Sequence, residues 1–258
     1  ERFAGALNGD LNTSRAITAV YDVLKAKTSD ATKLAAIADF DQVLSLNLMS
    51  AAEAIRKKEA EEAGADALLV VTPYYNKATQ GGLIKHFSMV ADVATVPLIM
   101  YNVPSRTGCN LLPETVAVLA EHPNIVGLKE ASGNMSQVVE LFAKCGDKID
   151  VYSGEDALTV AMMSMGGKGT ISVLSNVAPA EAVAMTDACK AGDFKTAAKM
   201  QADLLPLINA LFSEVNPIPA KAGVSAMGFG EENLRLPLTP MEDATRANLY
   251  AQMRKLGI

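Results

Sequence analysis

Tryptophan is absent from the 258 residues, aromatic residues make up only 5% of them, and there are just three cysteines and two histidines. The cysteines, Cys109, Cys145 and Cys189, lie far apart and in no CxxC spacing. That spacing excludes a disulfide framework and a cysteine-based zinc site, and it favours a reducing compartment. His86 and His122 have no carboxylate cluster at ligand spacing, so we expect no metal centre.

A basic surface and long apolar runs are also missing. The sequence has 23 Lys and Arg against 29 Asp and Glu, a net charge of −6. An acidic balance argues against nucleic acid as a partner, because the phosphate backbone needs basic side chains. No apolar run approaches the ~18 residues of a membrane span, and residues 1–5 have no signal-peptide pattern. We therefore expect a soluble, cytoplasmic protein with no membrane partner.

What is present is ample hydrophobic material arranged in alternating segments. Half of the residues are hydrophobic and 20% are charged, enough for a large core. Apolar runs of four or five residues predict strands covered on both faces, as in parallel sheets. The predicted strands are 42–46, 67–71, 98–101, 125–128, 150–153 and 170–173. Amphipathic helices are predicted between them at 51–63, 82–94, 113–120, 135–144 and 156–165.

After about residue 178 the pattern predicts helices only. They are expected at 179–191, 194–212, 219–227 and 240–256, separated by proline-rich linkers. The simplest architecture is a βα barrel with a helical appendage, a catalytic domain at 1–190 and a helical domain at 191–258. A barrel needs eight strands, and residues 1–41 do not supply the missing ones in recognisable form.

Reactive side chains stand at the predicted C-terminal ends of successive strands. Tyr101 ends one strand, Lys129 ends the next, and Arg106 follows in the loop after Tyr101. A desolvated lysine is a nucleophile toward ketones, a phenol can transfer protons, and a guanidinium binds a carboxylate. This set suggests chemistry on a small keto acid. Taken singly, each also has an ordinary interpretation: a rim lysine paired with Glu130, a packed tyrosine and a surface arginine.

Two further features have weaker implications. The adjacent Tyr74 and Tyr75 follow the strand at 67–71, which is typical of a site or a subunit contact. The glycine-rich segment 166–169 lacks the GxxxxGK[ST] pattern and precedes a strand, so it predicts a turn and not a phosphate-binding loop.

Several longer segments carry a family resemblance. They read AEAI at 52–55, GADALLVVTPYYNK at 64–77, YNVPSRTG at 101–108, PNIVGLKEASGN at 123–134, VYSGEDAL at 151–158, GGKGTISVLSNV at 166–177, EVNPIPAK at 214–221 and LRLPLTP at 234–240. In order and spacing the chain resembles the dihydrodipicolinate synthase family of lysine-dependent aldolases. The resemblance covers roughly residues 50–258. It implies a (β/α)8 TIM barrel with atypical or missing N-terminal strands, a C-terminal helical domain and a homotetramer built as a dimer of dimers.

The resemblance also implies roles for individual residues. Lys129 would form a Schiff base with pyruvate, and Tyr101 would be the proton-relay phenol. Tyr75 would reach into the neighbouring subunit's site, and Arg106 would hold the carboxylate of the second substrate, L-aspartate 4-semialdehyde. The pyruvate pocket would be lined by the backbones of Gly154 and Ile171. No metal or organic cofactor is implied, because the protonated imine is itself the electron sink.

The N-terminus departs from the family pattern. The family's Gly-Thr-Thr-Gly-Glu segment, which supplies a threonine to the relay, is missing, and Thr13 or Ser14 is the nearest candidate for its hydroxyl. Either residues 1–49 are a truncated stretch of an ordinary enzyme, or the chain kept the lysine but is catalytically silent. An aldolase for another 2-keto acid is a third possibility, although Arg106 favours the synthase. Glu53 and Tyr74 match residues of the family's lysine-inhibition cleft, but Met49 does not, so weak inhibition is expected.

Overall fold

The structure is a computed structural model, and it describes residues 64–258. The predicted strand at 42–46, the predicted helix at 51–63, and Thr13, Ser14, Met49 and Glu53 lie outside the described residues.

The described residues divide into a main part, 69–84 with 98–258, and a small part, 64–68 with 85–97. In the small part, the Leu68 N–H donates to the Pro97 carbonyl at 2.8 Å. The His86 and Phe87 rings meet edge to face there, with centroids 5.3 Å apart. Gly64 has a φ of +86°, in the left-handed region that favours glycine.

The strands form one sheet in the order β1-β2-β3-β4-β5, the same as their order along the chain. The pairs β2–β3, β3–β4 and β4–β5 are all parallel, as the unbroken apolar runs predicted. The strands are β1 Leu68–Val71, β2 Leu98–Asn102, β3 Ile125–Glu130, β4 Asp150–Ser153 and β5 Gly169–Thr170. Because parallel strands share one direction, their C-terminal ends lie along one edge.

Alternation along the strands separates two faces of the sheet. Met100, Leu128 and Val151 are register partners and are at most 1% exposed. Tyr101, Lys129 and Tyr152, the next partners along the strands, face the other way and stay half-buried. The first face is covered by hydrophobic core, and the second carries the reactive side chains.

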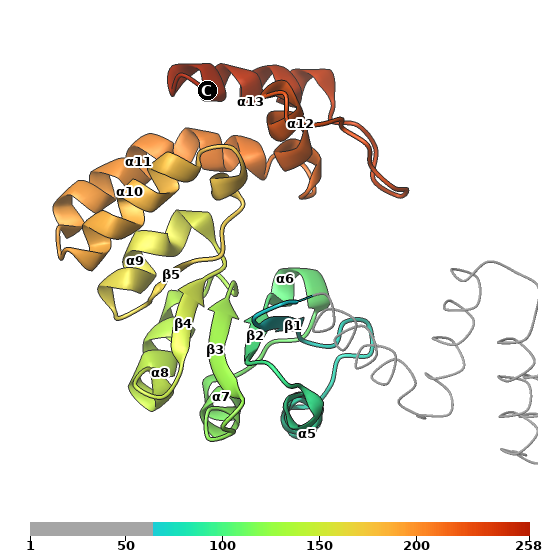
Figure 1. The fold of residues 1–258 in the computed structure, drawn as a ribbon, viewed down its shortest axis with the longest axis vertical. Helices are drawn as coiled ribbons and strands as arrows, with labels where there is room; N and C mark the ends of the chain where they lie inside the picture. Colours follow the sequence, from blue (N-terminus) through green and yellow to red (C-terminus); the bar gives the residue numbers. More distant parts are fainter. Residues whose placement is uncertain (1–63) are drawn as a thin grey trace, which may run out of the picture. The chain divides into compact units, whose positions relative to one another are not determined.

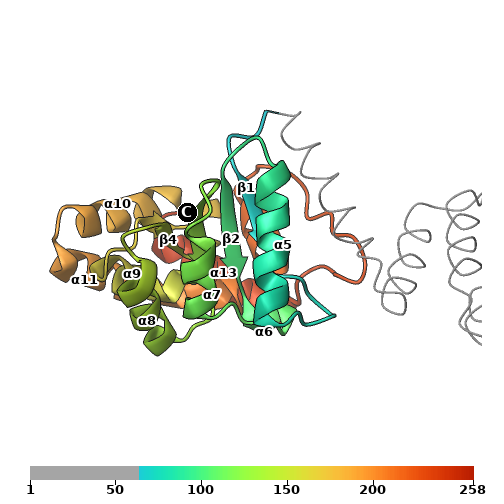
Figure 2. The ribbon, with the colours of Figure 1, turned by 90° about the horizontal axis from the view of Figure 1, so that it is seen from below.

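Helices follow the strands, as predicted. They are α5 Gln80–Val93, α6 Pro104–Thr107, α7 Pro113–Leu119, α8 Met135–Cys145, the 3₁₀ turn η1 Asp156–Leu158, and α9 Thr159–Ser164. Figures 1 and 2 both show α7 and α8 beside strands β2 to β4. Pro113 begins α7 at the position where its missing N–H costs nothing. The Asn134 side chain caps α8 by accepting from the N–H groups of Ser136 and Gln137.

Two predicted elements are shorter than expected, and Asp156 is the cause of one. The strand predicted at 170–173 ends at Thr170, and a 3₁₀ turn, η2 Leu174–Asn176, follows. The Asp156 carboxylate accepts from the N–H groups of Val173 and Leu174, both at 2.9 Å, so these donors are withdrawn from the ladder. The helix predicted at 156–165 is correspondingly divided into η1 and α9.

Four more helices complete the chain: α10 Pro179–Lys190, α11 Phe194–Leu211, α12 Ile218–Ala226 and α13 Asp243–Lys255. They share a continuous core with α9 and η2, in which Leu174, Ala197, Leu211, Ala222 and Leu249 are fully buried. The last helix was predicted from residue 240 but begins at Asp243. Pro240 lies in the preceding segment and is exposed.

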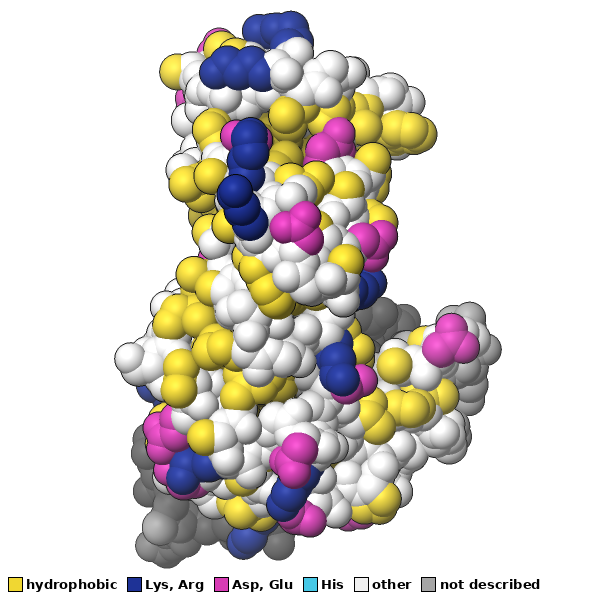
Figure 3. Space-filling view, turned by 90° about the vertical axis from the view of Figure 1, so that its left-hand side faces the viewer, with side chains coloured by type: hydrophobic (Ala, Val, Ile, Leu, Met, Phe, Trp, Pro, Cys, Tyr) yellow, Lys and Arg dark blue, Asp and Glu magenta, His cyan; other side chains and the backbone are white. Residues whose placement is uncertain are grey.

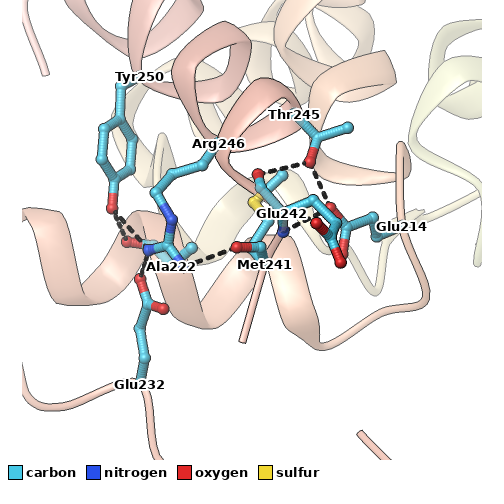
Figure 4. Close-up of polar contacts among 8 residues, drawn as sticks. All are labelled: Glu214, Ala222, Glu232, Met241, Glu242, Thr245, Arg246 and Tyr250. Carbon is cyan, nitrogen blue, oxygen red and sulfur yellow. Dashed lines mark hydrogen bonds and ion pairs between the residues drawn. The ribbon is translucent and has the colours of Figure 1, made fainter. Parts of the chain in front are cut away.

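Arg246 ties the segment before α13 to that helix (Figure 4). Its guanidinium pairs with Glu232, donates to the Met241 carbonyl at 3.0 Å and to the Tyr250 hydroxyl at 3.3 Å. On the other side of α13, the Glu214 carboxylate accepts from the Thr245 hydroxyl and from a backbone N–H of the helix start. These contacts fix where α13 begins.

Charged side chains of both signs stand among apolar and neutral ones on the face shown in Figure 3. Within residues 64–258, none of the helices has the length and apolarity required to cross a bilayer.

Candidate active site

Lys129 and Tyr101 meet at the C-terminal ends of β3 and β2. They are register partners on the half-buried face of the sheet, so their side chains project side by side. The Lys129 Nζ lies over the Tyr101 ring, 4.3 Å from its centroid, in a cation–π contact. The structure thus brings together an amine and a phenol-bearing ring that lie 28 positions apart in the sequence, while their catalytic roles stay a prediction.

Hydrogen bonds continue the sheet past the strand ends and position the neighbouring backbone. The Ala131 N–H donates to the Asn102 carbonyl at 2.9 Å, and the Gly154 N–H donates to the Glu130 carbonyl at 2.7 Å. One strand further, the Ile171 N–H donates to the Ser153 carbonyl at 2.8 Å. Gly154 and Ile171 are thus held along the same edge as Lys129 by backbone bonds.

Lys129 is held in an environment that favours its neutral amine. Burial lowers the pKa of Lys129 most, the nearby Asp156 carboxylate opposes that effect, and the Arg106 guanidinium lowers the pKa further. A lysine with a depressed pKa has more free base at neutral pH, and the free base is the form that attacks a carbonyl. The site therefore favours the nucleophilic form of Lys129.

Tyr101 has the opposite tendency. Burial raises its pKa, Arg106 works against this effect, and the Glu155 carboxylate adds to it. The phenol therefore stays protonated at neutral pH and can serve as a proton donor.

Arg106 reaches the site from the short helix α6. Its side chain is exposed, yet its charge lowers the pKa of both Lys129 and Tyr101. The buried Thr107 anchors this helix, because its hydroxyl accepts from the Thr72 hydroxyl at 3.2 Å and from the Cys109 N–H at 3.1 Å. The anchored helix leaves the guanidinium of Arg106 exposed, where it can bind an anion.

Gly154 is required by close approach to the lysine. A Cβ at this position would lie 2.8 Å from the Ala131 Cβ and 3.0 Å from both Cγ and Cε of Lys129. Any larger residue would displace the Lys129 side chain.

The site includes two carboxylates that the sequence analysis did not single out. Asp156 is 2% exposed and stands close enough to influence Lys129, while Glu155 influences Tyr101. Burial, and then the adjacent Asp156 charge, raise the pKa of Glu155. A signal was available: the acidic pair follows directly on the strand-end glycine Gly154, where parallel strands present functional groups.

A buried polar network lies under the strand ends and was also missed. The Asn102 side chain donates to the Glu130 carboxylate at 2.9 Å and accepts from the Leu111 N–H at 2.9 Å. It continues to Asn110, whose amide donates to Gln137 at 2.7 Å. The signal in the sequence was the polar residue directly after each of Tyr101 and Lys129.

Tyr75 is not brought to the Lys129 site of its own chain. It stands in the loop after β1 with 74% of its surface exposed and an unfavourable φ of +70°. Thr13, the proposed source of a relay hydroxyl, lies outside the described residues, so its role stays a prediction. Among residues 64–258, no group of three or more His, Cys, Asp or Glu is placed to hold a metal ion.

A strand-end lysine with a lowered pKa beside a protonated phenol, with a guanidinium near both on a parallel βα fold, defines a Schiff-base aldolase type of enzyme. The chain matches the dihydrodipicolinate synthetase family model over residues 41–256, and it belongs to that family.

Individual relatives agree in both sequence and fold. The chain is 51% identical over 207 residues to a 4-hydroxy-tetrahydrodipicolinate synthase of Geobacter sulfurreducens, covering 80% of this chain and 71% of the relative. It is 40% identical to the solved dihydrodipicolinate synthase of Thermotoga maritima, with a TM-score of 0.79 over 81% of this chain and 72% of the other. The chloride-inhibited enzyme of Acinetobacter baumannii, solved with pyruvate, is also 40% identical, with a TM-score of 0.78 over the same shares. The fold class is therefore the TIM barrel, of which the described sheet forms five strands.

Proposed function

We propose that this protein is a 4-hydroxy-tetrahydrodipicolinate synthase, which condenses pyruvate with L-aspartate 4-semialdehyde on the way to diaminopimelate and lysine. The observation that carries the proposal is the Lys129 amine 4.3 Å from the centre of the Tyr101 ring, in a chain that is 51% identical over 207 residues to an enzyme of that name. A biosynthetic role of this kind fits the cytoplasm.

The chemistry starts at Lys129. Its neutral amine attacks C2 of pyruvate, and the resulting carbinolamine loses water as the Tyr101 phenol gives a proton to the departing hydroxyl. The tyrosinate then takes a proton from C3, which converts the imine to an enamine. Burial serves both residues in this sequence, because it lowers the pKa of the lysine and raises that of the phenol.

Arg106 acts on the second substrate. Its guanidinium holds the carboxylate of the semialdehyde while the enamine carbon bonds to the aldehyde carbon, and the new alkoxide takes a proton from Tyr101. The amino group of the adduct then attacks C2 and displaces Lys129, which closes the six-membered ring and frees the enzyme. One water is released per turnover, and no redox step is needed.

We further propose that Tyr75 acts in the site of a neighbouring copy, in a homo-oligomer built as a dimer of dimers. Its exposure of 74% supports a role outside its own chain, since a large exposed aromatic on a strained loop is typical of an interface. Mixing a Lys129→Ala variant with a Tyr75→Phe variant should restore part of the activity that each lacks. Absence of any restoration in mixed oligomers would exclude a shared site.

The central test is reduction with borohydride in the presence of pyruvate, followed by peptide mass mapping. We expect the pyruvate adduct on Lys129 and nowhere else, and turnover when aspartate semialdehyde is added. A Lys129→Arg variant should give no adduct, because a guanidinium stays protonated. The exposed Lys199→Arg change serves as the matched control and should trap normally.

The results separate the alternatives. An adduct without condensation would contradict the synthase assignment and point to another 2-keto-acid aldolase or a silent homologue. No adduct at all would remove the Schiff-base mechanism itself.

A further inference from the structure

Glu130 is a buried carboxylate that the proposed chemistry leaves without a role. It follows Lys129 directly, is 2% exposed, and points to the opposite face of the sheet. In the part of the chain that the structure describes, only neutral donors hold its oxygens, namely the Asn102 amide at 2.9 Å, the Ser132 N–H at 2.6 Å and the Ser132 side chain, and burial raises the pKa of Glu130. A charge buried without a cation is costly, so a reason for its presence should exist.

The direction of every hydrogen bond around Glu130 is fixed by the backbone. The Leu111 N–H can only donate, so the Asn102 atom facing it must be the oxygen Oδ1. The Asn102 Nδ2 therefore points the other way and must donate, to Glu130 Oε2 and to Asn110 Oδ1. Because the Ser132 N–H occupies Oε1, both oxygens of Glu130 are required as acceptors.

This bond joins two strands beside the reactive pair. Asn102 and Glu130 are register partners, and the adjacent register pair is Tyr101 and Lys129. Strand ends are where a ladder frays, and among the described residues only the Ala131 N–H to Asn102 carbonyl bond continues the backbone ladder between β2 and β3. The side-chain bond adds a second tie on the face opposite the site.

We propose that Glu130 is a positioning residue, which by accepting from Asn102 sets the ends of β2 and β3 and so the placement of Lys129 against Tyr101. This inference rests on the proposed function, because it assumes that Lys129 forms the pyruvate imine. The proposed effect passes through geometry, whereas the pKa of Lys129 is shifted by burial, Asp156 and Arg106. Misplacement of reacting groups by about 1 Å can cost a factor of ~100.

The test is Glu130→Gln, which keeps the size of the side chain but can no longer accept at both positions. With the Ser132 N–H on its oxygen, the new amide would face the Asn102 amide, donor against donor. We expect the rate of pyruvate trapping on Lys129 to fall about tenfold across a pH series, with the midpoint of that series unmoved. The KM for aspartate semialdehyde should stay near that of the wild type. Glu140→Gln, an exposed change on α8, is the matched control.

A rescue variant separates positioning from general structural damage. The double variant combines Asn102→Asp with Glu130→Gln. The new carboxylate at position 102 would accept both from the Leu111 N–H and from the new amide at position 130, so the complementarity between these two positions is restored with the same total charge, while the Asn110 Oδ1 loses its donor at position 102. We expect trapping to recover most of its wild-type rate. Where Glu130→Gln alone does not fold, Asn102→Asp alone against the double variant carries the same comparison.

Each outcome decides the matter. Wild-type trapping by the Glu130→Gln variant, or a double variant as slow as its single variants, would overturn the positioning role. A wild-type protein that traps pyruvate but does not condense it would contradict the proposed substrate pair while the positioning test, read by trapping, stands. A wild-type protein that traps nothing would overturn both.

Discussion

At the scale of residues, burial and a nearby carboxylate have opposite effects on the pKa of Lys129. Burial pushes Lys129 toward its neutral form and Asp156 draws it back toward the ammonium. The nucleophile is therefore set by a balance of effects, and removal of one of them should shift its pH dependence in a known direction.

Asp156→Asn is the sharpest change for this balance. Both backbone bonds of Asp156 go to one oxygen, Oδ2, so an asparagine oxygen can keep them while the charge is lost. Because the carboxylate raises the pKa of Lys129, its removal should lower that pKa and move the pH profile of pyruvate trapping to lower pH. A set of trapping rates against pH measures it. The exposed Asp187→Asn change is the control, and an upward movement would contradict the assigned sign.

Gly154→Ala should injure the same lysine by contact. The new Cβ would stand 2.8 Å from Ala131 and 3.0 Å from Lys129. We expect a loss of about 1–3 kcal/mol in unfolding free energy from overpacking and pyruvate trapping reduced about tenfold or more. Gly81→Ala, in the helix α5 with nothing within 4 Å, is the comparison; it should leave trapping intact and should not lower the unfolding free energy, because alanine is the better helix former. Equal behaviour of the two variants in urea denaturation and trapping would argue against the close-approach role.

At the scale of elements, the sequence predicted the order and type of the strands and of the longer helices in residues 64–258, and the bounds where a local signal exists. It placed Arg106 in a loop, whereas this residue lies in the short helix α6. The strand Asp150–Ser153 and the helix start at Pro113 agree with prediction, because an apolar run and a proline mark them. The strand β5 was predicted too long, since the Asp156 carboxylate that accepts from the N–H groups of Val173 and Leu174 is distant in sequence.

The site residues also fall into those that the sequence could predict and those that it could not. Tyr101, Lys129 and Arg106 could be placed together because strand ends of a parallel sheet share an edge. The hydrogen bond between Asn102 and Glu130 could not be predicted, and neither could the bonds from the Val173 and Leu174 N–H groups to Asp156. Both depend on side-chain directions that no pattern of hydropathy encodes. The domain boundary at 190/191 remains our proposal.

Thr107 gives a prediction at this scale, because it anchors the helix that carries Arg106. Thr107→Val leaves the Cys109 N–H and the Thr72 hydroxyl without this acceptor, which costs about 1–3 kcal/mol of stability. The looser helix should raise the KM for aspartate semialdehyde about tenfold, ~1.4 kcal/mol of binding, with pyruvate trapping little changed. Steady-state kinetics check this. Thr186→Val, in α10, is the control, and a rise in the pyruvate KM alone would contradict the anchoring role.

At the scale of the molecule, the candidate site at the strand ends and the C-terminal helices are held by different interactions. The core shared by α9 to α13 is apolar and continuous, while the segment before α13 is held by the polar contacts of Arg246 (Figure 4). Stability and chemistry should therefore respond to different substitutions.

Arg246→Met tests that separation. It leaves the Glu232 carboxylate, whose side chain is 20% exposed, without its cation, and should lower the unfolding free energy by about 2 kcal/mol. The pyruvate adduct on Lys129 should form at the wild-type rate at low temperature. Lys199→Met removes an exposed pair on α11 and should change stability by less than about 0.5 kcal/mol. Urea denaturation compares the two, and equal losses would show that burial of the Arg246 pair is unimportant.

The stacking of the Lys129 amine on the Tyr101 ring has an optical consequence. A cation held over a phenol perturbs its near-ultraviolet absorption and its emission, and conversion of the amine to an imine with pyruvate rearranges that charge. With no tryptophan in the chain, the emission comes from its six tyrosines, and a Tyr101→Phe variant identifies the part that belongs to Tyr101. The protein therefore carries its own chromophore beside the nucleophile, by which occupancy of the site can be followed without a label.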